Sequence, residues 1–281
     1  MKDRPNPRVE PDADDPLVPA PDVRLTGQAL GIDIGGTEIK GAIVDLAEGR
    51  LLSDRAVVPT PRPSTPDSVL DAVAGLCEQL VSASALTADM PAGIGFPSVI
   101  KHGRPMTAAN IDPTWIGQPI ERLLRERLGR PVLVLNDADA AGVAEVTHGA
   151  GRGHEGVILL LTLGTGIGSA LFVDGRLVPN LELGHLEYQG QDVETLLSGS
   201  ARERRGLDWE TYGRELAAFL RQMDAWFWPD LFILGGGVSA ALDRYGAYLD
   251  VRPPLVAAAM LNRAGIVGAA LAGAYAAQHA S

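Results

Sequence analysis

Two glycine-rich turns combine the residue types that bind phosphate. The first, residues 35–40, follows an apolar run that is interrupted only by Asp33, and it contains a Thr and a Lys. The second, residues 163–168, follows the apolar run 157–162. Because glycine lacks a Cβ atom, the backbone N–H groups of such turns can face a ligand directly, and the Thr hydroxyl and Lys ammonium add two donors. Both turns are therefore candidate phosphate sites.

The two turns belong to a repeated pattern. Each is followed by a second apolar run and then by Gly-Arg-Leu, at residues 49–51 and 175–177, and Asp33 and Thr162 occupy the same place two residues before a glycine. An apolar run that ends in glycine predicts a buried strand entering a tight turn. The pattern indicates one strand–turn–strand–turn–strand unit used twice. Two related halves facing each other across a cleft would bring both turns to one site.

Asp137 is the candidate catalytic base. It follows a strand predicted for residues 131–135 and precedes a helix that should begin near Ala138. Open α/β sheets place ligand chemistry at the carboxyl ends of their strands. The competing interpretation of Asp137 is a helix N-cap, but the two glycine turns favour catalysis.

A polar segment, residues 180–194, contains Glu182, His185, Glu187 and Glu194. Glu182 and His185 are three residues apart, as metal ligands can be, but one His among scattered carboxylates is weak evidence for a metal site. Sugar recognition needs carboxylate and imidazole groups against vicinal hydroxyls and explains the segment better. Glu187 is interpreted as surface charge.

A small basic cluster, residues 101–104, contains Lys101 and Arg104. Only two other lysines occur in the chain, Lys2 and Lys40. The cluster fits either a solvated hairpin tip or a basic group beside the cleft.

Composition excludes several classes of protein. The chain has 281 residues, a formal net charge of −11 and one cysteine. The charge argues against a broad basic face for nucleic acid, and a single cysteine allows neither an intrachain disulfide nor a cysteine zinc site. No segment resembles a signal peptide, and the apolar stretch 264–277 is too short to span a bilayer. We therefore expect a cytoplasmic protein with no nucleic-acid or membrane partner.

The remaining pattern predicts the elements that position these residues. Residues 1–26 are rich in Pro and Asp and should form a disordered tail. Residues 59–66 connect the first unit to a helix that begins at Pro66 and buries Cys77 on its apolar stripe. The pattern also predicts strands at 92–97 and 231–234, a third glycine turn at 235–239, and helices at 209–226 and from about residue 264.

Two other phosphate-binding motifs do not fit. A P-loop requires Ser or Thr after its Lys, whereas Lys40 is followed by Gly41. The dinucleotide fingerprint opens a helix, whereas residues 164–168 have another spacing and lead into a strand-like run. What remains is a duplicated fold with phosphate hairpins at a cleft, the actin-like sugar-kinase arrangement.

The chain resembles the ROK family of sugar kinases over residues 27–277. The resemblance rests on the three glycine turns, on the pair Asn136-Asp137, on the Glu-x-Gly-His motif at 182–185 and on Glu194. It implies that Asp137 is the catalytic base. It implies a sugar site formed by Asn110, Asn136, Asp137, Glu182, His185 and Glu194, and phosphate contacts from Asp33, Gly35, Gly36, Thr37, Lys40, Thr165, Gly166 and Gly236.

Within that family the chain is most similar to polyphosphate glucokinases, at residues 96–103, 107–112 and 227–231 and at Trp115. The resemblance implies phosphoryl transfer from inorganic polyphosphate, with ATP as a further donor, to the 6-hydroxyl of glucose. It implies Mg²⁺ without direct protein ligands, with Asp33 a partner through water. Because a polyanion is repelled by a net charge of −11, Lys40, Lys101 and Arg104 are candidates to line its path.

The chain departs from the family in one loop. Many members carry a cysteine-rich zinc loop between the His and the last Glu, but residues 190–192 contain no cysteine. We therefore expect no structural zinc, and we expect packing alone to hold Glu194.

The expected fold is α/β, a duplicated actin-like (ribonuclease H-like) kinase with two lobes and a central cleft. The N-terminal lobe is predicted to span residues 27–137 together with the final helix, 264–281, and the C-terminal lobe residues 138–263. A homodimer is expected. The alternatives are an ATP-dependent ROK sugar kinase, which the third glycine turn supports, and a ROK-type transcriptional regulator, whose helix-turn-helix domain the Pro- and Asp-rich tail could not form.

Overall fold

The computed structural model of the chain describes residues 23–82 and 89–279. Most of the predicted tail, residues 1–22, lies outside the described residues, as do residues 280 and 281 of the predicted final helix. The last part of the predicted tail packs on the fold, because Leu25 is only 5% exposed and Val23 contacts the same hydrophobic core.

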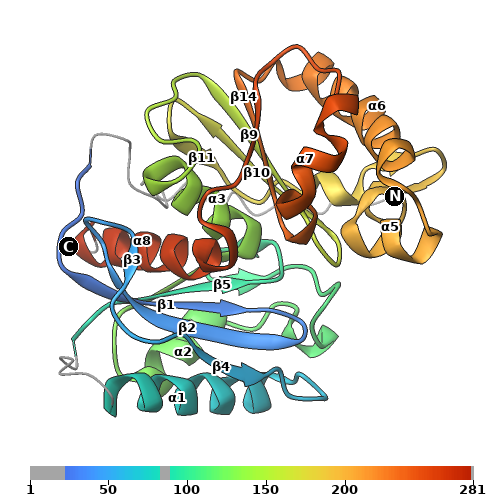
Figure 1. Ribbon diagram of the computed structural model, residues 1–281. Helices are drawn as coiled ribbons and strands as arrows, with labels where there is room; N and C mark the ends of the chain where they lie inside the picture. Colours follow the sequence, from blue (N-terminus) through green and yellow to red (C-terminus); the bar gives the residue numbers. More distant parts are fainter. Residues whose placement is uncertain (1–22, 83–88, 280–281) are drawn as a thin grey trace, which may run out of the picture.

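Two mixed β-sheets with the same strand order form the frame of the molecule (Figure 1). The first runs β3-β2-β1-β5-β8, with β4 also paired to β2, and the second runs β11-β10-β9-β14-β15. In each sheet the first three strands are antiparallel neighbours and the last two join in parallel. The first sheet contains β1 (Gln28–Ile34), β2 (Glu38–Asp45), β3 (Arg50–Leu51), β4 (Ala56–Pro59), β5 (Ala92–Phe96) and β8 (Val132–Asn136). The second contains β9 (Val157–Leu163), β10 (Ile167–Val173), β11 (Arg176–Val178), β14 (Leu231–Gly235) and β15 (Leu255–Ala257).

The two glycine turns close equivalent hairpins. Pairing of Ile34 with Ile39 closes a four-residue turn at 35–38, and pairing of Leu163 with Ile167 closes a three-residue turn at 164–166. Asp33 and Thr162 nevertheless occupy matching places in the two sheets, because Asp33 pairs with Gly95 of β5 and Thr162 pairs with Gly235 of β14. The predicted duplication is confirmed at the level of strand order.

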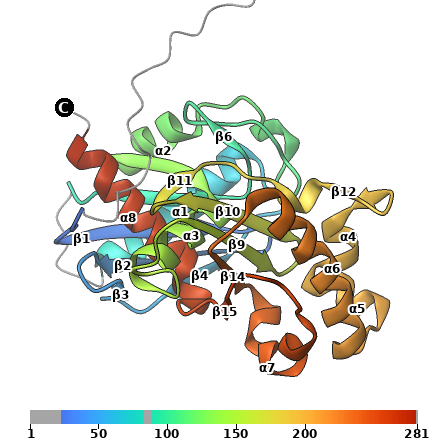
Figure 2. The same cartoon turned by 90° about the horizontal axis from the view of Figure 1, so that it is seen from above.

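Two helices lie between the sheets and others cover their outer faces. The ribbon views place α8 and α3 side by side between the sheets (Figures 1 and 2). α1 and α2 contribute to the hydrophobic core on the outer face of the first sheet, and α6 to the core on that of the second. The helices are α1 (Pro66–Ser82), α2 (Ile120–Leu128), α3 (Asp137–His148), α4 (Val193–Leu197), α5 (Gly199–Arg205), α6 (Trp209–Phe227), α7 (Leu242–Tyr245) and α8 (Ala264–His279). The short 3₁₀ helices are η1 (Pro113–Trp115), η2 (Leu183–His185), η3 (Gly237–Ala241), η4 (Gly246–Tyr248) and η5 (Leu261–Arg263). Two small hairpins pair β6 (Ile100–Lys101) with β7 (Arg104–Pro105) and β12 (Glu187–Tyr188) with β13 (Gln191–Asp192).

Glycine and alanine make up most of α8 because its backbone touches its neighbours. A Cβ atom at Gly268 would overlap the backbone carbonyl of Ala140 on α3. A Cβ at Gly93 on β5 would overlap the carbonyl of Ala269 on α8 in the same way. At such separations no side chain fits between the backbones, so composition here is dictated by packing.

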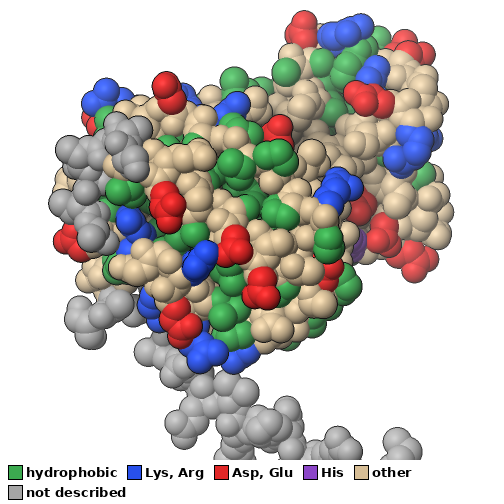
Figure 3. Space-filling model, turned by 90° about the horizontal axis from the view of Figure 1, so that it is seen from below, with side chains coloured by type: hydrophobic (Ala, Val, Ile, Leu, Met, Phe, Trp, Pro, Cys, Tyr) green, Lys and Arg blue, Asp and Glu red, His purple; other side chains and the backbone are tan. Residues whose placement is uncertain are grey.

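Strands of the first sheet come from residues 28–136 and those of the second from residues 157–257, and α8 packs on the first sheet. The division into lobes at residue 137, with residues 264–281 joined to the N-terminal lobe, stays a prediction. In the part of the chain that the structure describes, no helix combines the length and the apolar character needed to cross a bilayer. On the face shown in Figure 3, Lys and Arg side chains are scattered among Asp and Glu.

The packing of α8 predicts opposite effects of the same substitution on two helices. Gly268→Ala should lower the free energy of unfolding by about 2–3 kcal/mol, because the added methyl group displaces the Ala140 backbone. Gly75→Ala on α1, where a Cβ meets no atom within 4 Å, should instead raise it by up to about 1 kcal/mol through helix propensity. Urea unfolding of both variants measures the difference, and equal effects would contradict close α3–α8 packing.

Candidate active site

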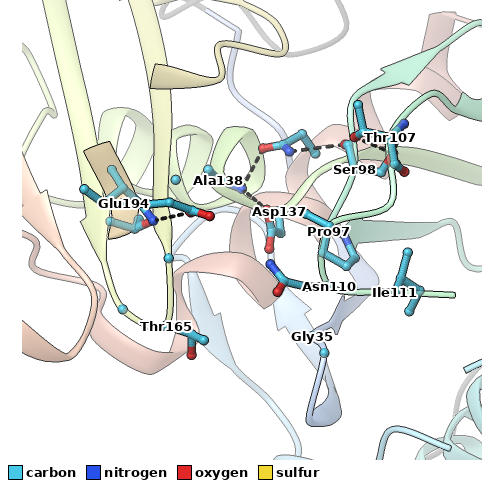
Figure 4. A pocket seen from close by; sticks show the side chains of 18 of the residues that line it. Gly35, Pro97, Ser98, Thr107, Asn110, Ile111, Asp137, Ala138, Thr165 and Glu194 are labelled. Carbon is cyan, nitrogen blue, oxygen red and sulfur yellow. Dashed lines mark hydrogen bonds between the residues drawn. The ribbon is translucent and has the colours of Figure 1, made fainter. Parts of the chain in front are cut away.

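A cleft of about 840 Å³ collects residues from both sheets (Figure 4). Its walls carry the two glycine hairpins, the loop 107–112, the start of α3 and the segment 181–194. The predicted site residues that line it are Gly35, Gly36, Thr37, Asn110, Asn136, Asp137, Thr165, Gly166, Glu182, His185 and Glu194.

A second pocket of about 220 Å³ adjoins the cleft, since Asp137, Ala138 and Thr162 line both. The remaining predicted phosphate residues, Asp33, Lys40 and Gly236, line this pocket. The structure therefore gathers all the predicted sugar and phosphate residues around Asp137.

Asn136, and not Asp137, is the N-cap of α3. Its Oδ1 atom accepts hydrogen bonds from the backbone N–H groups of Ala138 (2.9 Å) and Asp139 (3.1 Å), and its Nδ2 donates to the carbonyl of Ser98 (3.2 Å). The capping role that competed with catalysis thus belongs to the preceding residue. Most of the hydrogen-bonding capacity of the Asn136 amide is used inside the protein, so a sugar contact would use its remaining N–H.

The carboxylate of Asp137 is poised to change protonation near neutral pH. Burial raises its pKa to about 7, and the negative charges of Asp33 and Glu182 act in the same direction. In the close view, the side chains of Asp137 and Asn110 face one another inside the cleft (Figure 4). A carboxylate with a pKa close to the working pH is suited to accept a proton from an alcohol.

Asp33 on β1 and Asp137 at the start of α3 approach one another across Gly95 of β5. Gly95 pairs with Asp33 on one side, and a Cβ built on it would lie 3.5 Å from the Cα of Asp137 and 3.7 Å from the Asp33 carboxylate. Burial raises the pKa of Asp33, and the charge of Lys40 opposes that rise. Among the described residues no group donates a hydrogen bond to this carboxylate, so its oxygen lone pairs are available to the second pocket.

His185 is held between two carboxylates. Its Nδ1 lies 3.1 Å from Asp192 Oδ2, and its Nε2 lies 3.9 Å from Glu182 Oε2. The hydrogen bond to Asp192 raises the pKa of His185, and nearby acidic charges add to the rise. Burial raises the pKa of Glu182, whereas His185 lowers it. Asp192 was not predicted as a site residue, because only the fold brings it to the imidazole.

The prediction that packing alone holds Glu194 is wrong. Glu194 Oε2 accepts a hydrogen bond from the backbone N–H of Ile167 (3.2 Å), just past the second glycine turn. The hairpin β12–β13 precedes it, and Thr195 Oγ1 bonds to the side chain of Gln191 (2.9 Å) and to the carbonyl of Asp192 (2.7 Å). Hydrogen bonds therefore hold the loop before Glu194, the loop in which many family members were expected to carry a zinc site. Among the described residues, no group of three or more His, Cys, Asp or Glu is arranged to hold a metal ion.

Close backbone approaches couple the sugar and phosphate residues. A Cβ at Gly36 would lie 2.9 Å from the carbonyl oxygen of Asn110, and one at Gly166 would overlap the Glu194 carboxylate. Gly236 has a φ of +76°, and its Cβ would lie 2.6 Å from the backbone of Leu163. A side chain at Gly36 or Gly236 would push a predicted phosphate turn away from the neighbouring backbone, and one at Gly166 would displace the Glu194 carboxylate.

Lys101 and Arg104 lie on the small hairpin β6–β7 and line neither pocket. Both are exposed, and Arg104 donates to the carbonyl of Gly117 (2.5 Å). The structure places them at a hairpin tip, as one of the two interpretations had it. Their role toward a polyanion stays a prediction.

The connector 61–64 is a wall of the cleft that the sequence did not reveal. It carries Arg62, which has no acidic partner among the described residues. The connector is fixed by Trp115 Nε1, which donates to the carbonyl of Ser64 (2.9 Å), and by Thr60 Oγ1, which donates to the carbonyl of Gly35 (2.6 Å). The sequence indicated a connector at residues 59–66, but only these long-range contacts show which side chain faces the cleft.

The raised pKa of Asp137 predicts a pH-dependent cost to stability. An unfolded Asp titrates near 3.9, so ionising Asp137 destabilises the fold increasingly as the pH rises from about 4 to about 7. Asp137→Asn should therefore be more stable than the wild type by about 2 kcal/mol at pH 8, roughly half the full linkage value because the side chain is partly exposed. The gain should vanish near pH 4. Urea unfolding across this range tests it, with the exposed Asp243→Asn as control, and a gain independent of pH would contradict it.

Comparison with known proteins agrees with this geometry. Residues 29–201 match the ROK family. The polyphosphate glucokinase of Mycobacterium tuberculosis is 43% identical over 244 residues, which cover 86% of this chain and 90% of that protein. The crystal structure of the inorganic polyphosphate/ATP-glucomannokinase of Arthrobacter sp. strain KM is 52% identical with a TM-score of 0.84, covering 90% of this chain and all of that one.

A ROK family glucokinase from Streptomyces griseus, solved in complex with glucose and AMPPNP, is 28% identical with a TM-score of 0.74 and covers 87% of this chain and 98% of that one. The matched region includes both glycine hairpins, the Asn136-Asp137 pair and the segment 182–194. This chain belongs to the ROK family, and its fold is the duplicated actin-like sugar-kinase fold.

Proposed function

We propose that this protein is a polyphosphate glucokinase, which transfers the terminal phosphoryl group of inorganic polyphosphate to the 6-hydroxyl of glucose, with ATP as a second donor. The observation that carries the proposal is the position of Asp137. Asp137 lines the cleft together with the polar segment 181–194 and both glycine hairpins, and burial raises its pKa to about 7. The similarity to proteins named polyphosphate glucokinase and polyphosphate/ATP-glucomannokinase supports the choice of donor.

In the proposed reaction Asp137 orients the 6-hydroxyl and accepts its proton. The sugar oxygen forms a bond to the terminal phosphorus while the bridging P–O bond breaks, so that the donor leaves one phosphate shorter. The transition state of phosphoryl transfer is loose, and the proton moves late. A carboxylate with a pKa near 7 is a stronger base than an ordinary Asp, and positioning still supplies most of its effect.

Sugar binding is assigned to polar side chains from both sides of the cleft. Glu182, His185 and Glu194 offer oxygen and imidazole groups from one side, and Asn110 offers an amide from the other. His185, whose pKa is raised by Asp192, can donate a hydrogen bond to a hydroxyl, whereas the carboxylates accept. The two sides come from different halves of the fold, so closure of the halves on a sugar would exclude water from the reaction.

Phosphate binding is assigned to the backbone N–H groups of Gly36 and Gly166, with Gly35, Thr37, Thr165, Lys40 and Gly236 around them. The N–H of Gly35 donates to the carbonyl of Glu38 (2.9 Å) and holds the first hairpin closed. Mg²⁺ would neutralise phosphate oxygens when bound. The carboxylate of Asp33 fits a hydrated Mg²⁺, because it lines the second pocket and accepts no hydrogen bond from the described residues. The third glycine turn at Gly236 lines the same pocket and supports ATP as an additional donor. The homodimeric state and cytoplasmic location expected from the sequence are part of this proposal.

Removal of the proposed base tests the assignment directly. Asp137→Asn should reduce kcat with polyphosphate and with ATP by at least about 100-fold, and it should change the dissociation constant of glucose only a few-fold because the amide still contacts the hydroxyl. In the wild type, kcat/KM should fall about tenfold per pH unit below about 7, where Asp137 becomes protonated. Initial rates with each donor and glucose binding by calorimetry measure both. Wild-type kcat in Asp137→Asn, or a wild-type enzyme inactive with either donor, would contradict the proposal.

Positive charge near the cleft should matter more for the donor than for the sugar. The double variant Lys101→Ala/Arg104→Ala should raise the KM for polyphosphate several-fold and leave the KM for glucose nearly unchanged, because only the polyanion depends on screening of the net charge of −11. The double variant Arg214→Ala/Arg221→Ala on α6 removes the same charge elsewhere and serves as control. Equal changes in both KM values, or an equal effect of the control, would count against a role of the hairpin β6–β7.

A further inference from the structure

Asn180 joins three segments that carry the walls of the cleft. Its backbone N–H donates to Oδ2 of Asp139 on α3 (2.8 Å). Its side chain is bonded twice to Ile100 on β6, with Oδ1 accepting from the backbone N–H (2.7 Å) and Nδ2 donating to the carbonyl (3.0 Å). Ile100 belongs to the part of the chain that supplies the first sheet, whereas Asn180 follows the strands β10 and β11 of the second. One residue therefore ties together the two halves and the helix between them.

Each of the three tied segments leads within a few residues to a group of the proposed site. Asn180 stands two residues before Glu182, and Asp139 stands two residues after Asp137. Ile100 stands two residues after Ser98, whose carbonyl accepts from Asn136 and whose hydroxyl donates to the carbonyl of Thr107 (2.8 Å) at the start of the loop that carries Asn110. Movement of any one segment would be transmitted to the sugar-facing side chains.

The three hydrogen bonds of Asn180 to Asp139 and Ile100, called the tie below, carry an energetic cost. Asn180 has a φ of +64°, in the left-handed region that Asn tolerates better than most residues. Asp139 is 1% exposed, and its Oδ1 atom is buried with no hydrogen-bond partner among the described residues. A buried carboxylate with one oxygen unpaired is destabilising. A purely structural contact could be made at lower cost by an apolar pair, so the arrangement points to a requirement of the site.

We propose that Asn180, held by Asp139, is a positioning residue for glucose: it fixes Glu182 and His185 on one wall relative to Asp137 and Asn110 on the others. The inference rests on the proposed function, because it concerns the sugar side of the same site. In the described part of the chain Asn180 makes no hydrogen bond to the glycine hairpins, and the donor side is formed by other segments. Loss of the tie therefore affects sugar binding far more than donor binding.

The test substitutes Asn180 in two ways. Asn180→Gly keeps the left-handed backbone and the N–H to Asp139 but removes both bonds to Ile100. Asn180→Asp keeps the acceptor for the Ile100 N–H and replaces the donor with an oxygen that faces the Ile100 carbonyl. Both variants should raise the KM and the dissociation constant of glucose about tenfold or more, and the KM for polyphosphate should change less than twofold. Asp174→Gly is the matched control and should leave all three values unchanged, because Asp174 also has a positive φ (+49°) and its side chain also accepts from a distant backbone N–H, that of Gly156 (2.9 Å), at an exposed turn outside the cleft.

A second pair of variants separates positioning from folding. Asp139→Asn keeps an oxygen acceptor for the Asn180 N–H and should retain glucose affinity, whereas Asp139→Ala should reproduce the loss seen in Asn180→Gly. Thermal unfolding identifies any variant that fails to fold, and the comparison is then made on the remaining variant of that pair. Equal changes in the two KM values, or unchanged glucose affinity in folded Asn180→Gly and Asn180→Asp, would overturn the inference. A wild-type protein that neither binds glucose nor transfers a phosphoryl group would instead refute the proposed function.

Discussion

The contact between α3 and α8 is the constraint on which the site depends. The two helices meet backbone to backbone at Gly268 and Ala140, and α8 meets the first sheet in the same way at Gly93. This spacing sets how far the start of α3, and with it Asp137, stands from the end of β1. A Cβ at Gly265, near the start of α8, would lie 3.0 Å from the carboxyl carbon of Asp33. The small residues of α8 therefore place both acidic groups at one point, and bulkier residues would separate them.

That placement concentrates negative charge. Burial raises the pKa values of Asp33, Asp137 and Glu182, and the charges of Asp33 and Glu182 raise that of Asp137 further. The ionised free site is thus less stable than an uncharged one would be, as is common where catalytic groups are assembled. The compensating groups are Lys40 for Asp33, the backbone N–H of Ala138 for Asp137 (2.8 Å) and His185 for Glu182. A phosphate donor bound with Mg²⁺ would bring a cation to these carboxylates. Attraction to the cation would then offset the repulsion among the acidic groups.

Local patterns predicted what depends on neighbours in sequence. The glycine hairpins, the helix that begins at Pro66 and the position of Asp137 after a strand all follow from apolar periodicity and turn residues, and the structure agrees with each. Contacts between distant segments could not be read in this way. The cap at Asn136, the hydrogen bond that holds Glu194 and the pairing of Asn180 with Ile100 each depend on the fold having formed. The position of Arg62 in the cleft wall could not be predicted either, because a proline-rich connector does not indicate which of its side chains face a cleft.

The duplication explains the architecture but not the chemistry, because the two halves differ where they face the cleft. The first hairpin pairs Asp33 with Lys40, whereas the second pairs Thr162 with Gly168 at the matching positions. The last strand of the first sheet runs directly into α3 and presents Asp137, whereas the last strand of the second ends at Ala257 and α8 begins only at Ala264. One half thus carries the proposed base and the charged glycine turn, and the other carries the neutral turn and the carboxylates proposed to bind the sugar. Two identical half-sites would bind two ligands in the same way. The two different half-sites of this chain can instead hold two different ligands, the proposed donor and the proposed sugar, facing one another.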